Sequence, residues 1–268
     1  MVQDDEKDIP RVFRVKERRA EIARILEAEG SITVDRICDQ FEVSAVTARG
    51  DLNELERRGH LQRVHGGALP LDHTLVVADI NDRMGVNVSA KRKIARAAAG
   101  MVRDGDSIII DSGSTTFEFV TQLEGKENIT IVTHDLVIAN FVNKRLPNAT
   151  LVLLGGTLRY NHHYFCGALS LELVRKIYAD KAFFAANSFT EEQGFMTESE
   201  AAGEIKSTLL SHARQRIMLM DYSKVGLHNF VRFATLEDID RIIIDRDPEG
   251  YMRRAVSRAE NDTHLVIA

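Results

Sequence analysis

The sequence contains no tryptophan, and aromatic residues make up only 6% of its 268 residues. Proteins that bind single-stranded nucleic acid stack bases on aromatic side chains, so this scarcity argues against that class. No run of about 18 apolar residues occurs, and a helix that spans a membrane would need one. Residues 1–10 are polar and acidic, unlike a secretory signal. We therefore expect neither a membrane-spanning segment nor a membrane partner.

Cysteine is also scarce. Cys38 and Cys166 form neither a CxxC motif nor a pairing pattern, which is typical of a protein of the reducing cytoplasm. His162 and His163 lie near Cys166, but the spacing lacks a second ligand pair, so no metal and no other cofactor is predicted. The HExxH and GxSxG motifs of hydrolases are absent as well.

Positive charge is not in excess. Lysine and arginine number 35 against 40 acidic residues, which gives a net charge of −5. This balance argues against a chain that coats nucleic acid along its whole length. It is compatible with a small DNA-reading module, because only the local surface of such a module must be positive. A length of 268 residues with 44% hydrophobic residues suits two globular domains.

Three short helices are predicted near the N-terminus. Apolar residues recur at helical spacing over residues 16–29, and Gly30 ends that segment. Thr33 can cap a short second helix, and Ser44 can cap a third. The third helix is expected to turn three apolar side chains inward, namely Val46, Leu52 and Leu55.

A hairpin is predicted directly after the third helix, with a strand at 61–64, a turn at 65–67 and a short return strand. Helix, helix, turn, helix and hairpin in about 55 residues is the order of a winged helix-turn-helix, whose third helix enters the major groove. A generic helical bundle would show similar periodicity, but the polar turn and the Gly-Gly wing favour the DNA reader. We expect a flexible segment at 1–15, this domain at 16–70 and a linker at 71–88.

Several polar residues of this module are candidates for DNA contacts. Thr47 and Arg49 lie early on the third helix, where side chains reach base edges or phosphates, and Ser44 can hold a phosphate at the start of that helix. Contacts with the DNA backbone are expected from the helix end and the wing, from Arg57, Arg58, Arg63 and His65. Residues 41–65 carry four arginines and four acidic residues. Affinity must therefore come from placement and from dimerisation.

From residue 89 to 268 short apolar strands alternate with helices. This order predicts an α/β domain of Rossmann-like type, with a mostly parallel sheet covered on both faces. Residues 194–197 are expected to form a loop. The strands are expected at 107–110, 129–132, 150–154, 181–185, 217–220, 242–244 and 265–267, and the helices at 89–102, 115–123, 135–143, 169–177, 201–212 and 249–259.

The loop after the first of these strands has the composition of a phosphate-binding turn. Small residues let backbone N–H groups point at an anion, and the start of the following helix favours negative charge. The motif is neither a Walker A loop nor a dinucleotide GxGxxG. A Ser/Gly turn with a threonine cap remains the alternative. The candidate residues are Asp111, Ser112, Gly113, Ser114, Thr115 and Thr116.

Two other loops follow strands and can meet at the same edge of the sheet. Gly155 and Gly156 allow close approach of a ligand, and Arg159 can clamp a phosphate. Asp221 can accept from sugar hydroxyls while Lys224 meets a phosphate. Lys206, with Glu204 near it, can add charge. For each of these a plain loop or a solvated side chain is the alternative.

The chain resembles the DeoR family of bacterial regulators over about residues 16–268. The likeness lies in residues 43–52 (VSAVTARGDL), in the wing at 61–68 (LQRVHGGA), and in the three loops above, which follow in the same order. The resemblance implies a cytoplasmic repressor of a carbohydrate operon, a homodimer or tetramer, released from operator DNA by a phosphorylated sugar. It also implies an effector domain related in fold to ribose-5-phosphate isomerase.

Two residues depart from the family pattern. Gly50 stands where the family usually has a second basic residue, which removes a DNA contact and costs the helix about 1 kcal/mol. Tyr222 replaces a small residue near the effector pocket. The competing function is a sugar-phosphate isomerase or deaminase with a fused DNA-binding head. Such an enzyme needs a positioned acid/base pair; no convincing pair is found, so we expect no enzyme.

Overall fold

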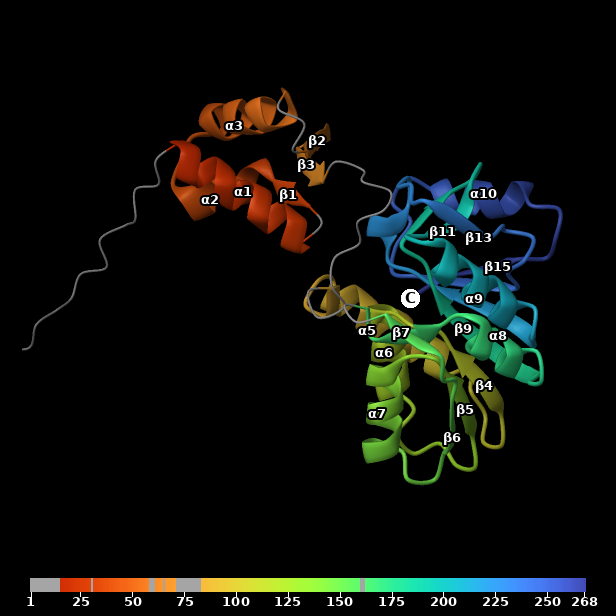
Figure 1. Ribbon diagram of the computed structural model, residues 1–268. Coiled ribbons are helices and arrows are strands. Elements are labelled where there is room, and N and C mark those ends of the chain that lie inside the picture. The colour runs from red at the N-terminus through yellow and green to blue at the C-terminus, as the bar shows by residue number, and fades with distance from the viewer. Residues whose placement is uncertain (1–14, 30, 58–60, 65, 71–82, 160–161) are drawn as a thin grey trace, which may run out of the picture. The chain divides into compact units, whose positions relative to one another are not determined.

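The computed structural model describes residues 15–268 except 30, 58–60, 65, 71–82 and 160–161. The chain divides into two compact units, Met1–Asp72 and His73–Ala268, which are described separately (Figure 1). Most of the expected N-terminal segment at 1–15 and of the expected linker at 71–88 lies outside the described residues. Within the described ranges, no helix is both long and apolar enough to cross a membrane.

The first unit is a winged helix-turn-helix, as the sequence predicts. Its strands form an antiparallel sheet in which β3 lies between β1 and β2. Strand β1 was not predicted, because two residues are too short to show a pattern. The elements are α1 (Val15–Glu29), β1 (Ile32–Thr33), α2 (Val34–Phe41), α3 (Ala45–Arg57), β2 (Leu61–Val64) and β3 (Gly67–Pro70).

The expected caps fix where these helices begin. The Thr33 side chain accepts a hydrogen bond from the backbone N–H of Arg36 at the start of α2. Ser44 Oγ accepts from the backbone N–H of Thr47, 3.2 Å away, at the start of α3. The helices bury a common core of aliphatic side chains that includes Ile22, Leu26, Ile37, Leu52 and Leu61.

One residue of α3 contradicts its expected orientation. Val46 was expected to point inward, but its side chain is 78% exposed. Ala48, two positions later, and Leu52 are fully buried, and Leu55 is only 5% exposed. Each helical residue turns about 100° around the axis, so residues two apart lie on nearly opposite sides. The prediction for Val46 is therefore wrong.

The second unit is built on a seven-stranded sheet in the order β15-β14-β12-β9-β4-β5-β6. Every pairing in it is parallel, and each of the seven predicted strands is present. Isoleucine-rich runs such as that of β4 are typical of strands buried on both faces. The strands are β4 (Ser107–Ile110), β5 (Thr130–Thr133), β6 (Thr150–Leu153), β9 (Ala179–Ala185), β12 (Ala213–Leu219), β14 (Arg241–Ile244) and β15 (His264–Ile267).

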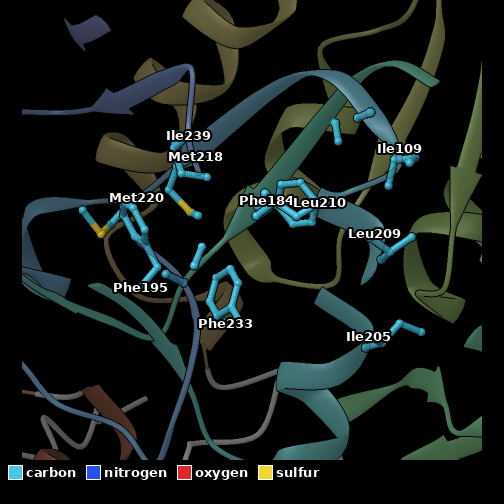
Figure 2. Close-up of a cluster of buried hydrophobic side chains, with 14 of the residues drawn as sticks. Ile109, Phe184, Phe195, Ile205, Leu209, Leu210, Met218, Met220, Phe233 and Ile239 are labelled. Carbon is cyan, nitrogen blue, oxygen red and sulfur yellow. The ribbon is translucent and has the colours of Figure 1, made fainter. Parts of the chain in front are cut away.

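Helices cover both faces of this sheet. Ile108 and Ile110 pack in one core with α5 (Val88–Ala99), α6 (Ser114–Thr121) and α7 (Leu136–Arg145). Ile109 points to the opposite face and packs with α8 (Ala168–Val174), α9 (Glu200–Leu210) and α10 (Tyr251–Arg258). Figure 2 shows part of this second core around Phe184, Leu209 and Met218. The predicted Rossmann-like α/β class is confirmed.

Two small antiparallel sheets were missed by the sequence analysis. One pairs β7 (Thr157–Arg159) with β8 (Tyr164–Cys166), and the other joins β10 (Ser188–Thr190), β11 (Gly194–Thr197) and β13 (Val231–Ala234). The expectation of a loop at 194–197 is wrong. All four residues of β11 are buried, so no alternation marks the strand. Gly194 is required there, since its φ is +77° and a Cβ would lie 2.3 Å from the Ala234 carbonyl oxygen.

The strand order places a crevice between β4 and β9. From β4 the chain proceeds through α6 to β5 on one side, and from β9 it proceeds through α9 to β12 on the other. The two connections cover opposite faces of the sheet. Ligands of open α/β sheets bind outside the carboxyl ends of the strands at such a switch point.

Candidate functional site

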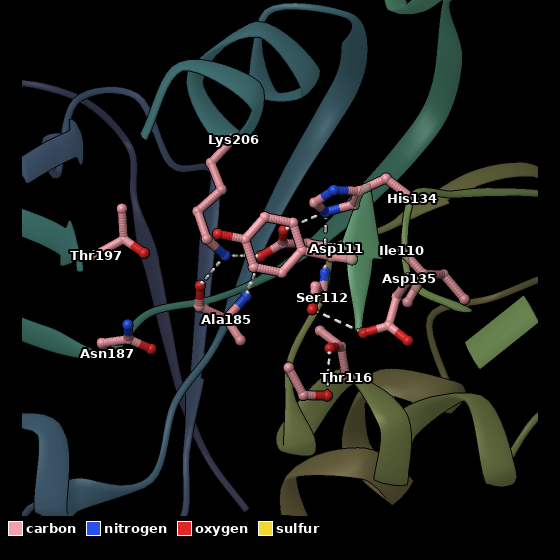
Figure 3. Close-up of polar contacts among 12 residues, drawn as sticks. Ile110, Asp111, Ser112, Thr116, His134, Asp135, Ala185, Asn187, Thr197 and Lys206 are labelled. Carbon is pink, nitrogen blue, oxygen red and sulfur yellow. Dashed lines mark hydrogen bonds and ion pairs between the residues drawn. The ribbon is translucent and has the colours of Figure 1, made fainter. Parts of the chain in front are cut away.

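Polar side chains gather at the carboxyl edge of the parallel sheet. Asp111 follows β4, His134 and Asp135 follow β5, Asn187 follows β9, and Asp221 follows β12. Because parallel strands end at the same edge, these residues come together although they are far apart in the sequence. Figure 3 shows Asp111, His134, Asp135 and Asn187 around the ends of β4, β5 and β9.

Asp111 and Lys206 form a buried ion pair at the centre of this edge. Lys206 Nζ donates to Asp111 Oδ2 and to the Ala185 carbonyl oxygen, the latter at 3.0 Å. Ala185 N–H also donates to Asp111 Oδ2, at 3.1 Å. Burial alone would raise the pKa of Asp111, but Lys206 and His134 outweigh it and hold that pKa below its usual value. The two predicted residues thus satisfy each other and join β4, β9 and α9.

His134 completes the support of Asp111 from the end of β5. Its Nδ1 lies 2.9 Å from the Phe165 carbonyl oxygen, which can only accept, so Nδ1 carries a proton. Its Nε2 lies 3.1 Å from Asp111 Oδ1 and 3.2 Å from the backbone nitrogen of Ser112. The ring therefore fixes where the 111–116 loop leaves β4.

Asp135 holds the same loop from the beginning of α7. It caps α7 by accepting from Val137 N–H and Ile138 N–H at 2.7 and 2.9 Å, and it accepts from Ser112 Oγ at 2.7 Å. Burial raises the pKa of Asp135. Ser112 thus uses its hydroxyl within the protein. His134 and Asp135 were missed by the sequence analysis, although their position directly after a predicted strand could have revealed them.

The beginning of α6 leaves two hydroxyls unused. Thr116 Oγ1 donates to the Gly113 carbonyl oxygen at 2.9 Å, so it closes the turn internally. Ser114 and Thr115 are 7% and 6% exposed, and neither hydroxyl has a hydrogen bond to another described residue. A Cβ on Gly113 would come within 2.9 Å of the Ala185 Cβ, so glycine lets the turn pass close to β9. Ser114, Thr115 and the first backbone N–H groups of α6 remain for a ligand.

A second group of polar side chains lies around the end of β12. Asp221 accepts from Asn87 Nδ2 at 3.0 Å and from Ser223 N–H at 3.1 Å. Its side chain is thus held within the protein, and the residue is only 2% exposed. Lys91 Nζ donates to the carbonyl oxygens of Arg83 and Val86. Asp221 thus links the segment before α5 to the end of β12.

Two lysines beside Asp221 are poorly solvated. Burial lowers the pKa of Lys91 to about 8, although Asp221 opposes the shift. Burial also lowers the pKa of Lys224, again against the attraction of Asp221. The Lys224 ammonium makes no hydrogen bond to any other residue in the described part of the chain, so it is the cation here with capacity for an anion.

The glycine loop after β6 is explained by packing. A Cβ on Gly156 would lie 2.3 Å from Ser170 Oγ and 2.6 Å from the Cys166 carbonyl oxygen. Ser170 Oγ donates to the Gly155 carbonyl oxygen at 2.5 Å. Arg159 is exposed on β7. Among the described residues no hydrogen bond joins 155–159 to the 111–116 loop, so a joint role of the two loops stays a prediction.

A hollow of about 560 Å³ lies elsewhere, between β10 and α10. Its lining includes Glu191, Tyr251 and Arg258, and Arg258 is already paired with Glu191 at 3.0 Å. The guanidinium group of Arg258 is therefore already paired within the protein. Over the described ranges, no three His, Cys, Asp or Glu residues are grouped so that they could hold a metal ion.

In the first unit, α3 presents one continuous outer face. Val46, Arg49, Gly50 and Asn53 are all exposed and recur at helical spacing. Ser44 Oγ and Thr47 Oγ1 lie 3.0 Å apart beside this face. The predicted residues Ser44, Thr47 and Arg49 are thus brought together at the beginning of α3.

The wing is tied to the same helix. The Arg63 guanidinium donates to Asn53 Oδ1, and the Arg63 backbone N–H donates to Glu56 at 2.8 Å. These two hydrogen bonds fix β2 against α3, so part of the hydrogen-bonding capacity of Arg63 is used within the protein. The side chain of Arg57, and the whole of Arg58 and His65, lie outside the described residues.

A buried ion cluster changes the charge balance of this module. Asp51 is 2% exposed and pairs with Arg18 at 2.6 Å and Arg19 at 2.7 Å, both on α1. One of the four acidic residues of 41–65 is therefore turned inward and neutralised, while Arg49 stays on the outer face. The exposed surface of α3 is more positive than the count of residues indicates.

Family models match both units. The model of the DeoR-like helix-turn-helix domain matches residues 18–74, and the model of the DeoR C terminal sensor domain matches residues 86–246. The sensor domain alone covers more than half of the chain, and the two matches follow in the order of the two structural units.

Curated relatives cover nearly the same span. The HTH-type transcriptional regulator GolR of Listeria innocua is 33% identical over 229 residues, which are 85% of this chain and 90% of that protein. The HTH-type transcriptional repressor GlcR of Bacillus subtilis is 32% identical over 87% of this chain and 89% of its own length. A lactose phosphotransferase system repressor of Staphylococcus aureus is 29% identical, over 87% and 93%.

Solved structures overlap more weakly. Ribose 5-phosphate isomerase A from Methanocaldococcus jannaschii is 19% identical, with a TM-score of 0.39 over 52% of this chain and 55% of that chain. The translation initiation factor eIF-2B of Pyrococcus horikoshii OT3 is 14% identical, with a TM-score of 0.41 over 81% and 73%. At such values neither overlap bears on function.

Proposed function

Because the chain belongs to the DeoR family, and is thus a DNA-binding transcriptional regulator and not an enzyme, we propose how it is controlled. A phosphorylated sugar binds at the carboxyl edge of the parallel sheet in the second unit. Its binding releases the first unit from the operator of a carbohydrate-utilisation operon. The name of the lactose phosphotransferase system repressor supports a sugar as the signal.

The observation that carries this proposal is the unsatisfied beginning of α6. Ser114 and Thr115 are nearly buried, yet their hydroxyls have no hydrogen-bond partner among the described residues. The first N–H groups of a helix also lack partners and favour an anion. A phosphate would satisfy these donors together, and Lys224 offers the cation. Asp111, Ser112, Gly113, Thr116 and Lys206 then act as the frame of the cradle.

The sugar itself would meet the polar groups after β9 and β11. Asn187 Nδ2 donates to Glu198 Oε2 at 2.7 Å, and Tyr164 Oη donates to Glu198 Oε1 at 3.0 Å. Thr197 Oγ1 donates to the same carboxylate at 2.6 Å. Amides, hydroxyls and carboxylates are groups that can hydrogen-bond to sugar hydroxyls, which supports a polyol as the remainder of the effector. Asp221 and the 155–159 loop, with Arg159, are kept as further candidates.

The DNA partner is double-stranded operator DNA, read by α3 in the major groove through Ser44, Thr47 and Arg49. Backbone contacts are proposed for Arg57, Arg58, Arg63 and His65. Helix-turn-helix proteins bind paired half-sites as dimers, which supports a homodimer or a tetramer of this chain. The cytoplasm, where operator DNA lies, is the proposed location.

A thermal-shift screen tests the effector site. Sugars, their phosphates and inorganic phosphate are each added to the full chain. A ligand at a hundredfold its dissociation constant adds about 2.7 kcal/mol of stability. We expect a shift with at least one phosphorylated sugar and none with its unphosphorylated form.

Two variants localise that ligand. Ser114→Asp places a carboxylate in the cradle and should abolish the shift, whereas Ser257→Asp, the same change on the exposed face of α10, should preserve it. The site is wrong if Ser114→Asp binds the ligand as tightly as the natural chain does. The proposed signal is wrong if no phosphorylated sugar shifts the natural chain.

A further inference from the structure

Val46 occupies an unusual place for an apolar side chain. It lies on the second residue of α3, is 78% exposed, and is the most exposed of the large hydrophobic residues described. Single exposed apolar residues are common and need no explanation by themselves. This one, however, stands at the beginning of the helix that enters the major groove, where side chains contact base edges.

The neighbours of Val46 make its position on the reading face specific. Gly50 lies one turn later on the same face, and a Cβ there would have no atom within 4 Å. Val46 and Gly50 thus form a low, apolar strip, and Arg49 and Asn53 continue the same exposed face. Because glycine has no side chain, the groove edge can approach the helix beside the valine methyl groups.

The major groove offers one apolar feature that matches this strip. The 5-methyl group of thymine projects there, and apolar side chains distinguish thymine by contacting it. We propose that Val46 reads the methyl group of a thymine in each operator half-site. The proposal rests on the DNA-binding function of the family and is independent of the effector site.

Deoxyuridine tests this contact, because it removes the methyl group and leaves every hydrogen-bonding group of thymine in place. Operator duplexes are first selected from random-sequence DNA with the full chain. Each thymine of the selected site is then replaced singly by uracil, and binding is titrated by fluorescence anisotropy. At one position of a half-site the replacement should weaken binding of the natural chain about fourfold, as expected for loss of one buried methyl.

The variant Val46→Ala completes a double-mutant cycle. It should bind the thymine and uracil duplexes equally, and about as weakly as the natural chain binds the uracil duplex. Val15→Ala is the matched control, since Val15 is 48% exposed on α1 and off the reading face. It should keep the fourfold ratio.

Two results would overturn the proposal in distinguishable ways. If Val46→Ala keeps the same thymine-to-uracil ratio as the natural chain at every position, Val46 does not read a methyl group. If selection enriches no sequence at all, the DNA-binding function fails and the contact fails with it.

Discussion

Asp111 shows how one buried residue can hold several elements of the candidate site together. Both carboxylate oxygens are engaged, by His134 on one side and by Lys206 and Ala185 on the other. Replacing this aspartate by asparagine leaves the buried Lys206 ammonium without its counter-charge. Breaking a buried ion pair from one side typically costs about 3–5 kcal/mol. We expect Asp111→Asn to lower the free energy of unfolding by that amount, measured by chemical denaturation followed by circular dichroism.

An exposed pair provides the control for this change. Glu172 on α8 and Lys176, just after the end of that helix, are joined at 3.0 Å, but both side chains are more than half exposed. Surface pairs contribute little, so Glu172→Gln should change the free energy of unfolding by less than about 1 kcal/mol. Equal effects of the two substitutions would show that the Asp111 pair is not structural.

We expect Lys91 to make binding of the proposed effector depend on pH. Burial lowers its pKa to about 8 in the folded chain, against 10.5 for a free lysine. Between these values the unfolded chain binds more protons, so the free energy of unfolding rises with pH. The attraction for a phosphate does the opposite, because the folded chain loses this positive charge above about pH 8. Affinity for the phosphorylated sugar should therefore fall from pH 8 to 9.5.

Calorimetric titration across that range measures the effect. Lys91→Arg keeps its charge at every pH used, so its affinity should stay flat above pH 8 unless Lys224 also loses its proton there. Lys224→Arg and the double variant Lys91→Arg/Lys224→Arg distinguish the contributions of the two lysines to the pH dependence of affinity. An affinity of the natural chain that is constant from pH 7 to 9.5 would contradict an electrostatic contribution of these two lysines to phosphate binding.

At the scale of an element, Gly50 lowers the helix stability of α3 and lies on the face of α3 that is proposed to read DNA. Gly50 lies in mid-helix, exposed and with open space around it. Glycine in a helix interior costs about 0.5–1 kcal/mol relative to alanine. Gly50→Ala should therefore raise the thermal stability of the first unit by that amount, while Gly66→Ala in the wing, where φ is +84°, should lower it. If both substitutions changed the stability of the first unit in the same direction, the helical geometry at Gly50 would be contradicted.

Arginine at the same position tests the DNA contact that this chain lacks. Gly50→Arg should add about one phosphate contact and steepen the dependence of log affinity on log salt by about 0.9. The same variant covers the space beside Val46. A slope identical to that of the natural chain would show that Gly50 does not face the DNA backbone.

The elements also show what could be predicted from the sequence. The seven parallel strands were found because each contains a short apolar run, and a predicted helix follows five of the seven before the next strand of that sheet. The antiparallel strands β10, β11 and β13 were missed because they are three or four residues long and β10 and β11 show no alternation of burial. The prediction for Val46 is wrong because apolar character alone does not determine which side of a helix a residue occupies, and Val46 lies nearly opposite the buried Ala48.

The sequence likewise predicts only part of the candidate functional site. The 111–116 turn was predicted as a candidate site from composition, and its place at the sheet edge follows from the strand before it. The partner of Asp111 could not be recognised, since Lys206 is 95 residues away and the pair exists only through the crossing of β9 and α9. Composition also indicated a ligand role for Gly156. In the structure, the close contacts with Ser170 and Cys166 explain why a glycine is present at this position.

At the scale of the whole molecule, control requires that the effector and the operator bind to different states of the chain. A ligand shifts an equilibrium only by its differential affinity for two states. Linkage then makes the effect reciprocal: if the effector weakens operator binding by a given factor, saturating operator DNA weakens effector binding by the same factor. Such factors are typically about 5- to 150-fold.

Arg49→Ala separates this coupling from the effector site itself. The side chain is exposed on α3, so its loss should weaken operator binding by about 1–3 kcal/mol while leaving effector affinity in the absence of DNA unchanged. Calorimetry with and without operator duplex measures both factors. In the natural chain they should agree, and in Arg49→Ala added duplex at the same concentration should no longer reduce effector affinity. Unequal factors at equilibrium would mean that the effector acts on something other than release from the operator.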